Sequence, residues 1–439
     1  MRVFLDITRI ASRIARSTPT GIDRVEFAWA KSLFHSEMGA SFGVLTTPRL
    51  AGALSGERVA RVMDGVEAAW GLGGTAAQDP MFQALKRWLS SPIALEARKP
   101  ARFFDERRTR LSLADWAKLP FGDLVGAGRR LKREATRGPS AYIHVSHLFL
   151  ERPRAFAWAR RDNVARVFML HDSIPVEFPE FCRPRKDALH MRRLKTLSEL
   201  ASLIITNSRD SERSIRALLK EQGWRAPDIA VTPLGVAEAF ADPSKLDPPA
   251  PATPYFVCVG TIEPRKNLAF LLIVWRRLVQ TLGARAPRLV LVGRRGWENE
   301  NVVDILDRSQ VLAPYLAEVA DLTDPGLASL MAGASAFLAP SLAEGYGMPL
   351  AEALAVGAPA IASDIPSHRE IAGDLIPYFD IVDGRGWMEA IKAYSAAESP
   401  ARAKAKATLS GRRRTSWEDH VRVVLGLAGQ ETNCRTDQR

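Results

Sequence analysis

The segment EGYGMPLAE, residues 344–352, places two glutamates eight positions apart around two glycines and a proline. Pro349 and the apolar residues after it indicate that a helix begins here, with Glu344 in the preceding loop and Glu352 inside the helix. Glycines let a backbone approach a ligand closely, and the free N–H groups of a helix start favour an anion. Carboxylates suit hydroxyls better than phosphates. The pattern therefore fits a nucleotide sugar, with Glu352 on the ribose and Glu344 on the sugar.

A second motif supplies the positive charge that a diphosphate needs. GTIEPRKNL, residues 260–268, follows an apolar run and contains a glycine turn and then Arg265 and Lys266. Two cations at a strand end face the crevice of a parallel sheet and can hold a diphosphate there. Either motif alone also has an ordinary structural interpretation, as helix capping or as a surface charge pair. Together they favour a binding site.

Buried strands that alternate with helices must position these motifs. Apolar runs that end in polar residues predict parallel strands at 2–8, 141–146, 165–172, 201–208, 228–236, 255–260, 288–293, 336–341 and 358–363. The proline-rich stretch after residue 236 is the best linker. We therefore predict an α/β chain of two domains, 1–238 and 239–415. Residues 55–138 are interpreted as a mostly helical insertion, 416–430 as a terminal helix and 431–439 as a disordered tail.

Composition and charge limit the class of protein. Hydrophobic and charged contents of 46% and 25% are average for globular domains, and no apolar run reaches the ~18–20 residues of a membrane span. Three distant cysteines form neither a disulfide framework nor a metal knuckle, so we expect a reduced, cytoplasmic protein. The net charge of +12 is concentrated at residues 98–137, where twelve basic residues against five acidic ones leave +7. This cluster is either a surface for phosphate-rich partners or a solvated helical face.

The motifs resemble the family-4 retaining glycosyltransferases of the GT-B fold, in particular the bacterial polysaccharide and mannosyltransferase group. The resemblance rests on GTIEPRKNL, LVLVGRRGW and APSLAEGYGMPLAEALAVGAPAIASDIPSHREIAGD in the second domain, and on HDSIPVEFPEF and TNSRDS in the first. It implies two Rossmann-like domains that face each other across a cleft, with the donor bound mostly by the second. The terminal helix is similar to the one that packs back on the first domain in this family.

The resemblance also implies roles for individual residues. Arg265 and Lys266 would neutralise the departing diphosphate, and His171 would reach the donor sugar. Glu344 and the backbone from Gly345 through Tyr346 and Gly347 to Met348 would hold that sugar. Glu352 would bind the ribose. Gly260 and Gly21 would form the turns that approach the phosphates.

The expected activity is metal-independent transfer of a hexose with retention of configuration. The chain has no D-x-D motif for a metal–diphosphate clamp, and no metal or cofactor is expected. The donor is a nucleotide diphosphate sugar, with GDP-mannose favoured and UDP- or dTDP-sugars as alternatives. The acceptor is a saccharide, including one carried on a polyprenyl diphosphate, at the inner face of the cytoplasmic membrane. The alternatives are a nucleotide-sugar epimerase, which needs no acceptor, and a non-catalytic membrane-associated assembly protein. A specific nucleic-acid partner is not expected, because no recognition motif is present.

Overall fold

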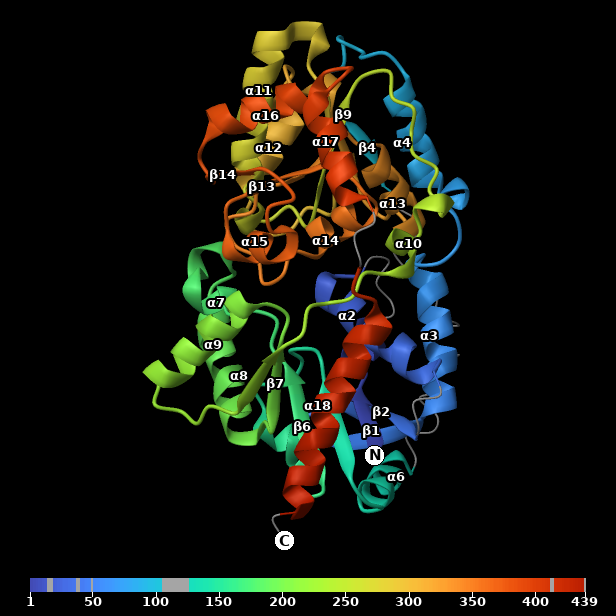
Figure 1. The fold of residues 1–439 in the computed structure, drawn as a ribbon, viewed down its shortest axis with the longest axis vertical. Coiled ribbons are helices and arrows are strands. Elements are labelled where there is room, and N and C mark those ends of the chain that lie inside the picture. Colours follow the sequence, from blue (N-terminus) through green and yellow to red (C-terminus); the bar gives the residue numbers. More distant parts are fainter. Residues whose placement is uncertain (14–18, 37–39, 49, 105–125, 411–413, 438–439) are drawn as a thin grey trace.

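The computed structural model describes residues 1–13, 19–36, 40–48, 50–104, 126–410 and 414–437. These residues form two α/β domains that lie end to end along the long axis of the molecule (Figure 1). Each domain has helices packed on both faces of its own sheet, which is wholly or mostly parallel, the expected arrangement for alternating strands and helices. The carboxyl ends of the two sets of strands meet between the domains.

In the described residues, the first domain holds a seven-stranded sheet in the order β3-β2-β1-β5-β6-β7-β8. Its strands are β1 (Arg2–Asp6), β2 (Ser41–Thr46), β3 (Ala51–Ser55), β5 (Ser140–His144), β6 (Val164–Met169), β7 (Leu203–Thr206) and β8 (Asp228–Val231). All neighbours are parallel except β2 and β3. The predicted strands of this domain are confirmed. The hairpin of β2 and β3 was not predicted, because SFGVLT and AGALS contain glycine and few β-branched residues.

The helices of the first domain cover both faces of this sheet. They are α1 (Thr8–Arg13), α2 (Gly21–Phe34), α3 (Gly56–Trp70), α6 (Ala127–Ala135), α7 (Ile174–Glu177), α8 (Lys186–Leu200), α9 (Arg209–Glu221) and α18 (Trp417–Asp437). The terminal helix α18 packs Val421, Val424 and Ala428 into the core beside α2, β5 and β6. It continues to Asp437, so the prediction of a disordered tail from residue 431 is wrong for the residues described here.

The second domain also has a seven-stranded sheet in its described residues, in the order β14-β13-β12-β9-β10-β11-β4, with parallel pairing throughout. Its strands are β4 (Ala101–Phe103), β9 (Tyr255–Val259), β10 (Arg288–Val292), β11 (Leu316–Val319), β12 (Ala336–Ala339), β13 (Ala360–Ser363) and β14 (Tyr378–Phe379). Its helices are α4 (Pro80–Ser90), α10 (Glu238–Ala241), α11 (Leu268–Leu282), α12 (Glu300–Arg308), α13 (Asp324–Gly333), α14 (Met348–Ala355), α15 (Pro366–Ala372), α16 (Gly384–Ser395) and α17 (Pro400–Leu409). The four predicted strands are confirmed.

The segment 76–103 corrects the predicted domain organisation. We expected residues 55–138 to be a helical insertion of the first domain, but α4 and β4 belong to the second. Phe82, Leu85 and Leu89 of α4 are fully buried in the core of the second domain, and β4 adds an edge strand to β11. The chain therefore enters the second domain after Trp70, returns to the first at α6, and crosses again near residue 235. Only these long-range contacts reveal the assignment.

Two buried charged side chains fix this excursion to the second domain. Asp79 accepts hydrogen bonds from the backbone N–H groups of Met81 and Phe82 at the start of α4. Its other oxygen accepts from the backbone and hydroxyl of Thr323, which caps α13. At the far end of α4, Arg288 donates to the carbonyls of Trp88, Leu89 and Pro92 and lies over the indole of Trp88 at 4.2 Å. The carboxylate of Asp79 thus accepts hydrogen bonds from N–H groups at the starts of two helices, and the guanidinium of Arg288 donates to carbonyl groups at the end of α4.

The two interdomain connections near residues 235 and 415 lie against each other. Val236 N donates to Thr415 O at 3.0 Å, and a Cβ on Gly235 would lie 2.5 Å from Trp417 N. Only a glycine allows this close crossing without displacing the backbone. None of the helices in the described ranges is long and apolar enough to cross a membrane.

Candidate functional site

The two predicted cations lie at the carboxyl end of β9, in the short turn before α11. Gly260 has φ +148°, and a Cβ there would lie 2.6 Å from Lys266 Cε, so the lysine stem packs directly on the glycine backbone. Lys266 is 7% exposed, and the side chain of Arg265 is 25% exposed. Because Gly260 has no side chain, the stem of Lys266 fits against its backbone, and the Nζ group is held in one place at the strand end.

The structure brings Glu344 directly onto both cations. Glu344 Oε2 accepts from Arg265 Nη1 at 2.5 Å, and Oε1 accepts from Lys266 Nζ at 2.5 Å and from Ser341 Oγ at 2.8 Å. Glu263 also pairs with Arg265 Nε at 2.6 Å. Burial alone would raise the pKa of Glu344, but Arg265 and Lys266 outweigh it and lower the pKa well below its ordinary value. Glu344 is therefore ionised and orients both cations.

Glu352 occupies a different environment, on the face of α14 that meets α2. It is 8% exposed, and burial raises its pKa to about 7, against the attraction of Arg24. Arg24 of α2 makes an interdomain ion pair of 2.6 Å with Asp324 at the start of α13. Glu352 lines a cavity of about 790 Å³ between the domains. Other lining residues are Arg24, Phe27, Leu72, Val236 and Trp417. This arrangement can accommodate a polar ligand of nucleotide size.

The loop between the two glutamates closes the cleft against the first domain. Gly345 O accepts from Ser208 Oγ at 2.7 Å, and a Cβ on Gly345 would lie 2.8 Å from His171 O. Tyr346 OH donates to Leu234 O at 3.3 Å. Gly345 is thus required by close approach, and the loop is held by first-domain groups.

The helix start that follows this loop meets the first helix of the other domain. Gly347, with φ +99°, is the residue before α14, which begins at Met348. A Cβ on Gly21, at the start of α2, would lie 3.6 Å from Met348 Cε. The predicted glycine turn and the predicted donor loop therefore face each other.

His171 lies two residues beyond β6, close to Gly345. Its Nε2 is 2.8 Å from the carbonyl oxygen of Val145, and a carbonyl can only accept a hydrogen bond. Nε2 therefore carries the hydrogen, and in the neutral ring Nδ1 is an acceptor. Burial lowers the pKa of His171 to about 4, so the ring is neutral at physiological pH. A sugar hydroxyl that reaches this ring would have to donate to Nδ1.

Four residues of this constellation were not predicted from the sequence: Glu263, Arg24, Asp324 and Asp172. Glu263 lies two residues before Arg265 in the GTIEPRKNL motif, so its pairing with Arg265 could have been predicted from the sequence. Arg24 and Asp324 are 300 positions apart, and only the packing of α2 on α13 brings them together. The pKa of Asp172 is raised by burial, although Arg265 across the cleft opposes this.

Comparisons with known proteins find that this chain is similar to glycosyltransferases. Residues 253–393 match the family model described as glycosyl transferases group 1. The serotype-specific mannosyltransferase WbdA of Escherichia coli is 29% identical over 252 residues, which cover 54% of this chain and 30% of WbdA. O-antigen chain mannosyltransferase B of Escherichia coli is 29% identical over 250 residues, covering 51% and 63%. This chain thus spans less than two thirds of either relative.

A solved structure resembles nearly the whole chain. The crystal structure of Anabaena Alr3699/HepE in complex with UDP has a TM-score of 0.58 and 14% sequence identity, covering 98% of this chain and 99% of that one. At this identity the likeness shows the fold, and the fold is GT-B. Together with the family match and the relatives, it shows that this chain has the GT-B fold and is similar to glycosyltransferases named as polysaccharide mannosyltransferases. The resemblance predicted from the motifs is confirmed.

Proposed function

We propose that this protein is a retaining, metal-independent hexosyltransferase of cell-surface polysaccharide biosynthesis. The observation that carries the proposal is the convergence of Arg265, Lys266 and Glu344 at the interdomain cleft, next to His171. The donor is a nucleotide diphosphate sugar, and we favour GDP-mannose over UDP- and dTDP-sugars because both relatives are named mannosyltransferases. The acceptor is a saccharide, carried on a polyprenyl diphosphate. These relatives do not favour the epimerase or the non-catalytic assembly protein.

The proposed reaction uses fixed charges at the leaving group. The bond between the anomeric carbon and the diphosphate oxygen breaks while the acceptor hydroxyl bonds to the same face of that carbon. The diphosphate leaves with the electron pair and takes the hydroxyl proton. Arg265, Lys266 and the N-terminus of α14 would stabilise the negative charge that develops on it, so no metal is required. Glu344 would hold the side chains of Arg265 and Lys266 in position through its two carboxylate oxygens, and it would lie beside the reacting sugar.

The donor and the metal requirement can be tested together. We expect GDP-mannose to raise the melting temperature by mass action and to be consumed only when an acceptor is present. Activity should be equal in the presence of EDTA and of added Mg²⁺ or Mn²⁺. Consumption of donor without acceptor would contradict transferase activity. Inactivation by EDTA that Mn²⁺ restores would contradict metal independence. The same measurements with UDP- and dTDP-sugars show which nucleoside base of the donor the protein prefers.

We also propose reversible attachment to an anionic membrane surface through α6. The structure divides the basic segment predicted at 98–137. Arg98 and Arg102 bind Gln310, Asp307 and Glu318 of the second domain, and residues 105–125 lie outside the described ranges. The basic residues that remain on or just after α6 are Arg129, Arg130, Lys132, Arg133 and Arg137.

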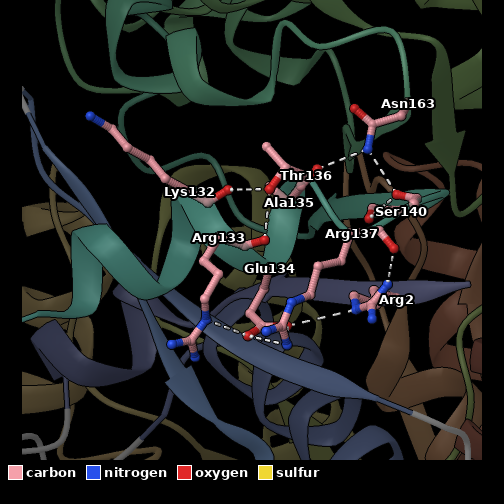
Figure 2. Close-up of polar contacts among 10 residues, drawn as sticks. Arg2, Lys132, Arg133, Glu134, Ala135, Thr136, Arg137, Ser140 and Asn163 are labelled. Atoms are coloured by element: carbon pink, nitrogen blue, oxygen red, sulfur yellow. Dashed lines mark hydrogen bonds and ion pairs between the residues drawn. The ribbon is translucent and has the colours of Figure 1, made fainter.

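An acidic residue offsets part of this α6 cluster. Glu134 pairs with Arg133 at 3.0 Å, with Arg137 at 3.2 Å and with Arg2 at 3.8 Å, whereas Lys132 extends away from it (Figure 2). Five basic residues and one acidic residue leave +4 on this surface. Figure 1 shows α6 at the end of the first domain that is remote from the second. The α6 cluster would therefore anchor that end, and not the cleft itself.

Vesicle binding provides the test of this attachment. Each basic residue near an anionic leaflet contributes about 1 kcal/mol, within a Debye length of about 8–10 Å. We expect sedimentation with phosphatidylglycerol vesicles at low salt, weakening steeply as salt rises. The four substitutions Arg129→Gln, Arg130→Gln, Lys132→Gln and Arg133→Gln should abolish most of it. The matched control neutralises the exposed residues Arg276, Arg277, Lys404 and Lys406 of the second domain. Equal binding to neutral phosphatidylcholine vesicles would contradict the proposal.

A further inference from the structure

The start of α9 lies where the two domains meet and carries two serines that the proposed chemistry does not use. Ser208 and Ser211 belong to the TNSRDS motif, residues 206–211, which begins at the last residue of β7. Both serines are almost fully buried, with exposed fractions of 1% and 5%. Helix α9 contacts α15 of the second domain. Two buried hydroxyls therefore lie at the interdomain boundary, and buried hydroxyls in folded proteins are nearly always hydrogen-bonded.

Each hydroxyl reaches a backbone carbonyl that lies beside the candidate site. Ser208 Oγ donates to Gly345 O at 2.7 Å, in the donor loop of residues 344–348. Ser211 Oγ donates to His171 O at 3.0 Å, and its contact with Gly345 O is longer, at 3.3 Å. A hydroxyl has a single hydrogen to donate, so the shorter contacts assign one carbonyl to each serine. The two serines thus connect a loop of the second domain with a strand end of the first.

The helix holds both hydroxyls in place. Ser208 is the N-cap of α9, and its Oγ accepts from the backbone N–H of Ser211 at 3.1 Å. The two Oγ atoms are 3.0 Å apart. An N-cap needs only the acceptor function of its side chain. The hydroxyl hydrogen of Ser208 is therefore available for the contact across the cleft, which capping alone does not explain.

A carboxylate of the second domain meets the same helix start. Both oxygens of Glu370, on α15, accept from the backbone N–H of Arg209 at 2.9 Å. The first N–H groups of a helix have no partner within it, and the helix dipole favours negative charge at this end. The start of α9 therefore binds the second domain at Gly345 and at Glu370, and its own domain at His171.

We infer that Ser208 and Ser211 are positioning residues that fix the donor loop relative to His171, an inference that rests on the proposed transferase function. Glu344 and His171 come from different domains, so their separation depends on how the two domains are placed. A shared anchor at α9 sets this separation, and Glu370 reinforces it from α15. A misplacement of about 1 Å can cost about 10²-fold in rate, because the groups around a reacting centre must be aligned.

The test compares two serine caps with the same hydrogen-bond pattern. Ser208→Ala removes the donor to Gly345 O, and we expect kcat to fall about tenfold while the affinity for GDP, or for UDP where GDP does not bind, is unchanged. The proposed nucleotide contacts all lie in the second domain. Ser399→Ala is the matched control, because Ser399 caps α17, accepting from Arg402 N at 3.0 Å and donating to Ala393 O at 2.7 Å. This control should keep the kcat of the wild type.

Further substitutions separate the contact across the cleft from the helix cap. Ser208→Thr keeps the cap and the hydroxyl hydrogen, so it should keep most of the activity. Ser208→Asp also keeps the cap, but an ionised carboxylate has no hydrogen to donate, so stability should recover without kcat. Ser211 is not the cap, and Ser211→Ala releases His171 O. It should lower kcat as Ser208→Ala does, and it provides the test if the variants of Ser208 do not fold.

Hydrogen exchange gives a second readout, which does not depend on turnover. The backbone amides of residues 344–348 should exchange faster in Ser208→Ala and at the wild-type rate in Ser399→Ala. Equal exchange in Ser208→Ala and wild type, equal kcat in Ser208→Ala and Ser399→Ala, or equal kcat in Ser208→Asp and Ser208→Thr would overturn the positioning role alone. Absence of sugar transfer by the wild type with every donor and acceptor would instead overturn the proposed function. Faster exchange in Ser208→Ala would then still support the anchor.

Discussion

Lys266→Ala is expected to lower kcat/KM by about 10²–10³-fold, which corresponds to about 3–4 kcal/mol of transition-state stabilisation. The structure gives the physical reason. Lys266 Nζ is fixed by its packing on Gly260 and by Glu344, so it meets the leaving diphosphate without reorganisation. Arg265→Ala should have a similar effect. The loss should appear largely in kcat, because charge on the leaving group grows as the bond breaks.

Initial rates at saturating donor check this prediction, and thermal unfolding checks that the variants are folded. Arg276→Ala, which removes an exposed cation from α11 of the same domain, is the matched control and should keep full activity. Turnover close to that of the wild type in both Lys266→Ala and Arg265→Ala would show that these side chains do not contact the reacting diphosphate.

Glu352→Gln is expected to weaken nucleotide binding. In the free protein it should also increase the free energy of unfolding, by up to about 3 kcal/mol at pH values above 8. The pKa of Glu352 is raised from 4.5 to about 7 by burial, so the folded state binds the extra proton between these values. The stability of the wild type must therefore fall as pH rises through this window, because the unfolded chain ionises first. The difference between 4.5 and about 7 sets the figure of about 3 kcal/mol. Glutamine does not ionise, so the Glu352→Gln variant should lack this fall in stability with rising pH.

Urea unfolding from pH 4 to pH 9 measures the slope, and calorimetry with GDP and UDP measures the binding. Glu344→Gln provides the comparison, because Glu344 lies beside the cations and the reacting sugar whereas Glu352 lines the interdomain cavity. Glu344→Gln should mainly reduce turnover, and Glu352→Gln should mainly reduce nucleotide affinity. Equal losses of nucleotide affinity in the two variants, or an unchanged pH profile in Glu352→Gln, would contradict this division of roles.

The sequence alone determined the two-domain α/β architecture and the motifs of the candidate site. Buried parallel strands are nearly continuous apolar runs, so β1, β5, β6, β9, β10, β12 and β13 can be located from local composition. The chemistry-bearing residues follow such strands, and the carboxyl ends of parallel strands meet at one edge. The motifs after β9 and β12, with Arg265, Lys266 and Glu344, were therefore predictable as one site.

Tertiary structure decided the rest, because the deciding contacts join residues that are far apart in the chain. A short amphipathic helix and a three-residue strand carry no mark of the domain in which they are buried, so only packing assigns α4 and β4 to the second domain. Sequence pattern predicted that Glu344 would meet hydroxyls, but it could not show that both carboxylate oxygens hold Arg265 and Lys266. The pKa of Glu352 depends on burial and on the charges of Arg24 and Asp324, which lie on two other helices. Such environments exist only once the chain has folded.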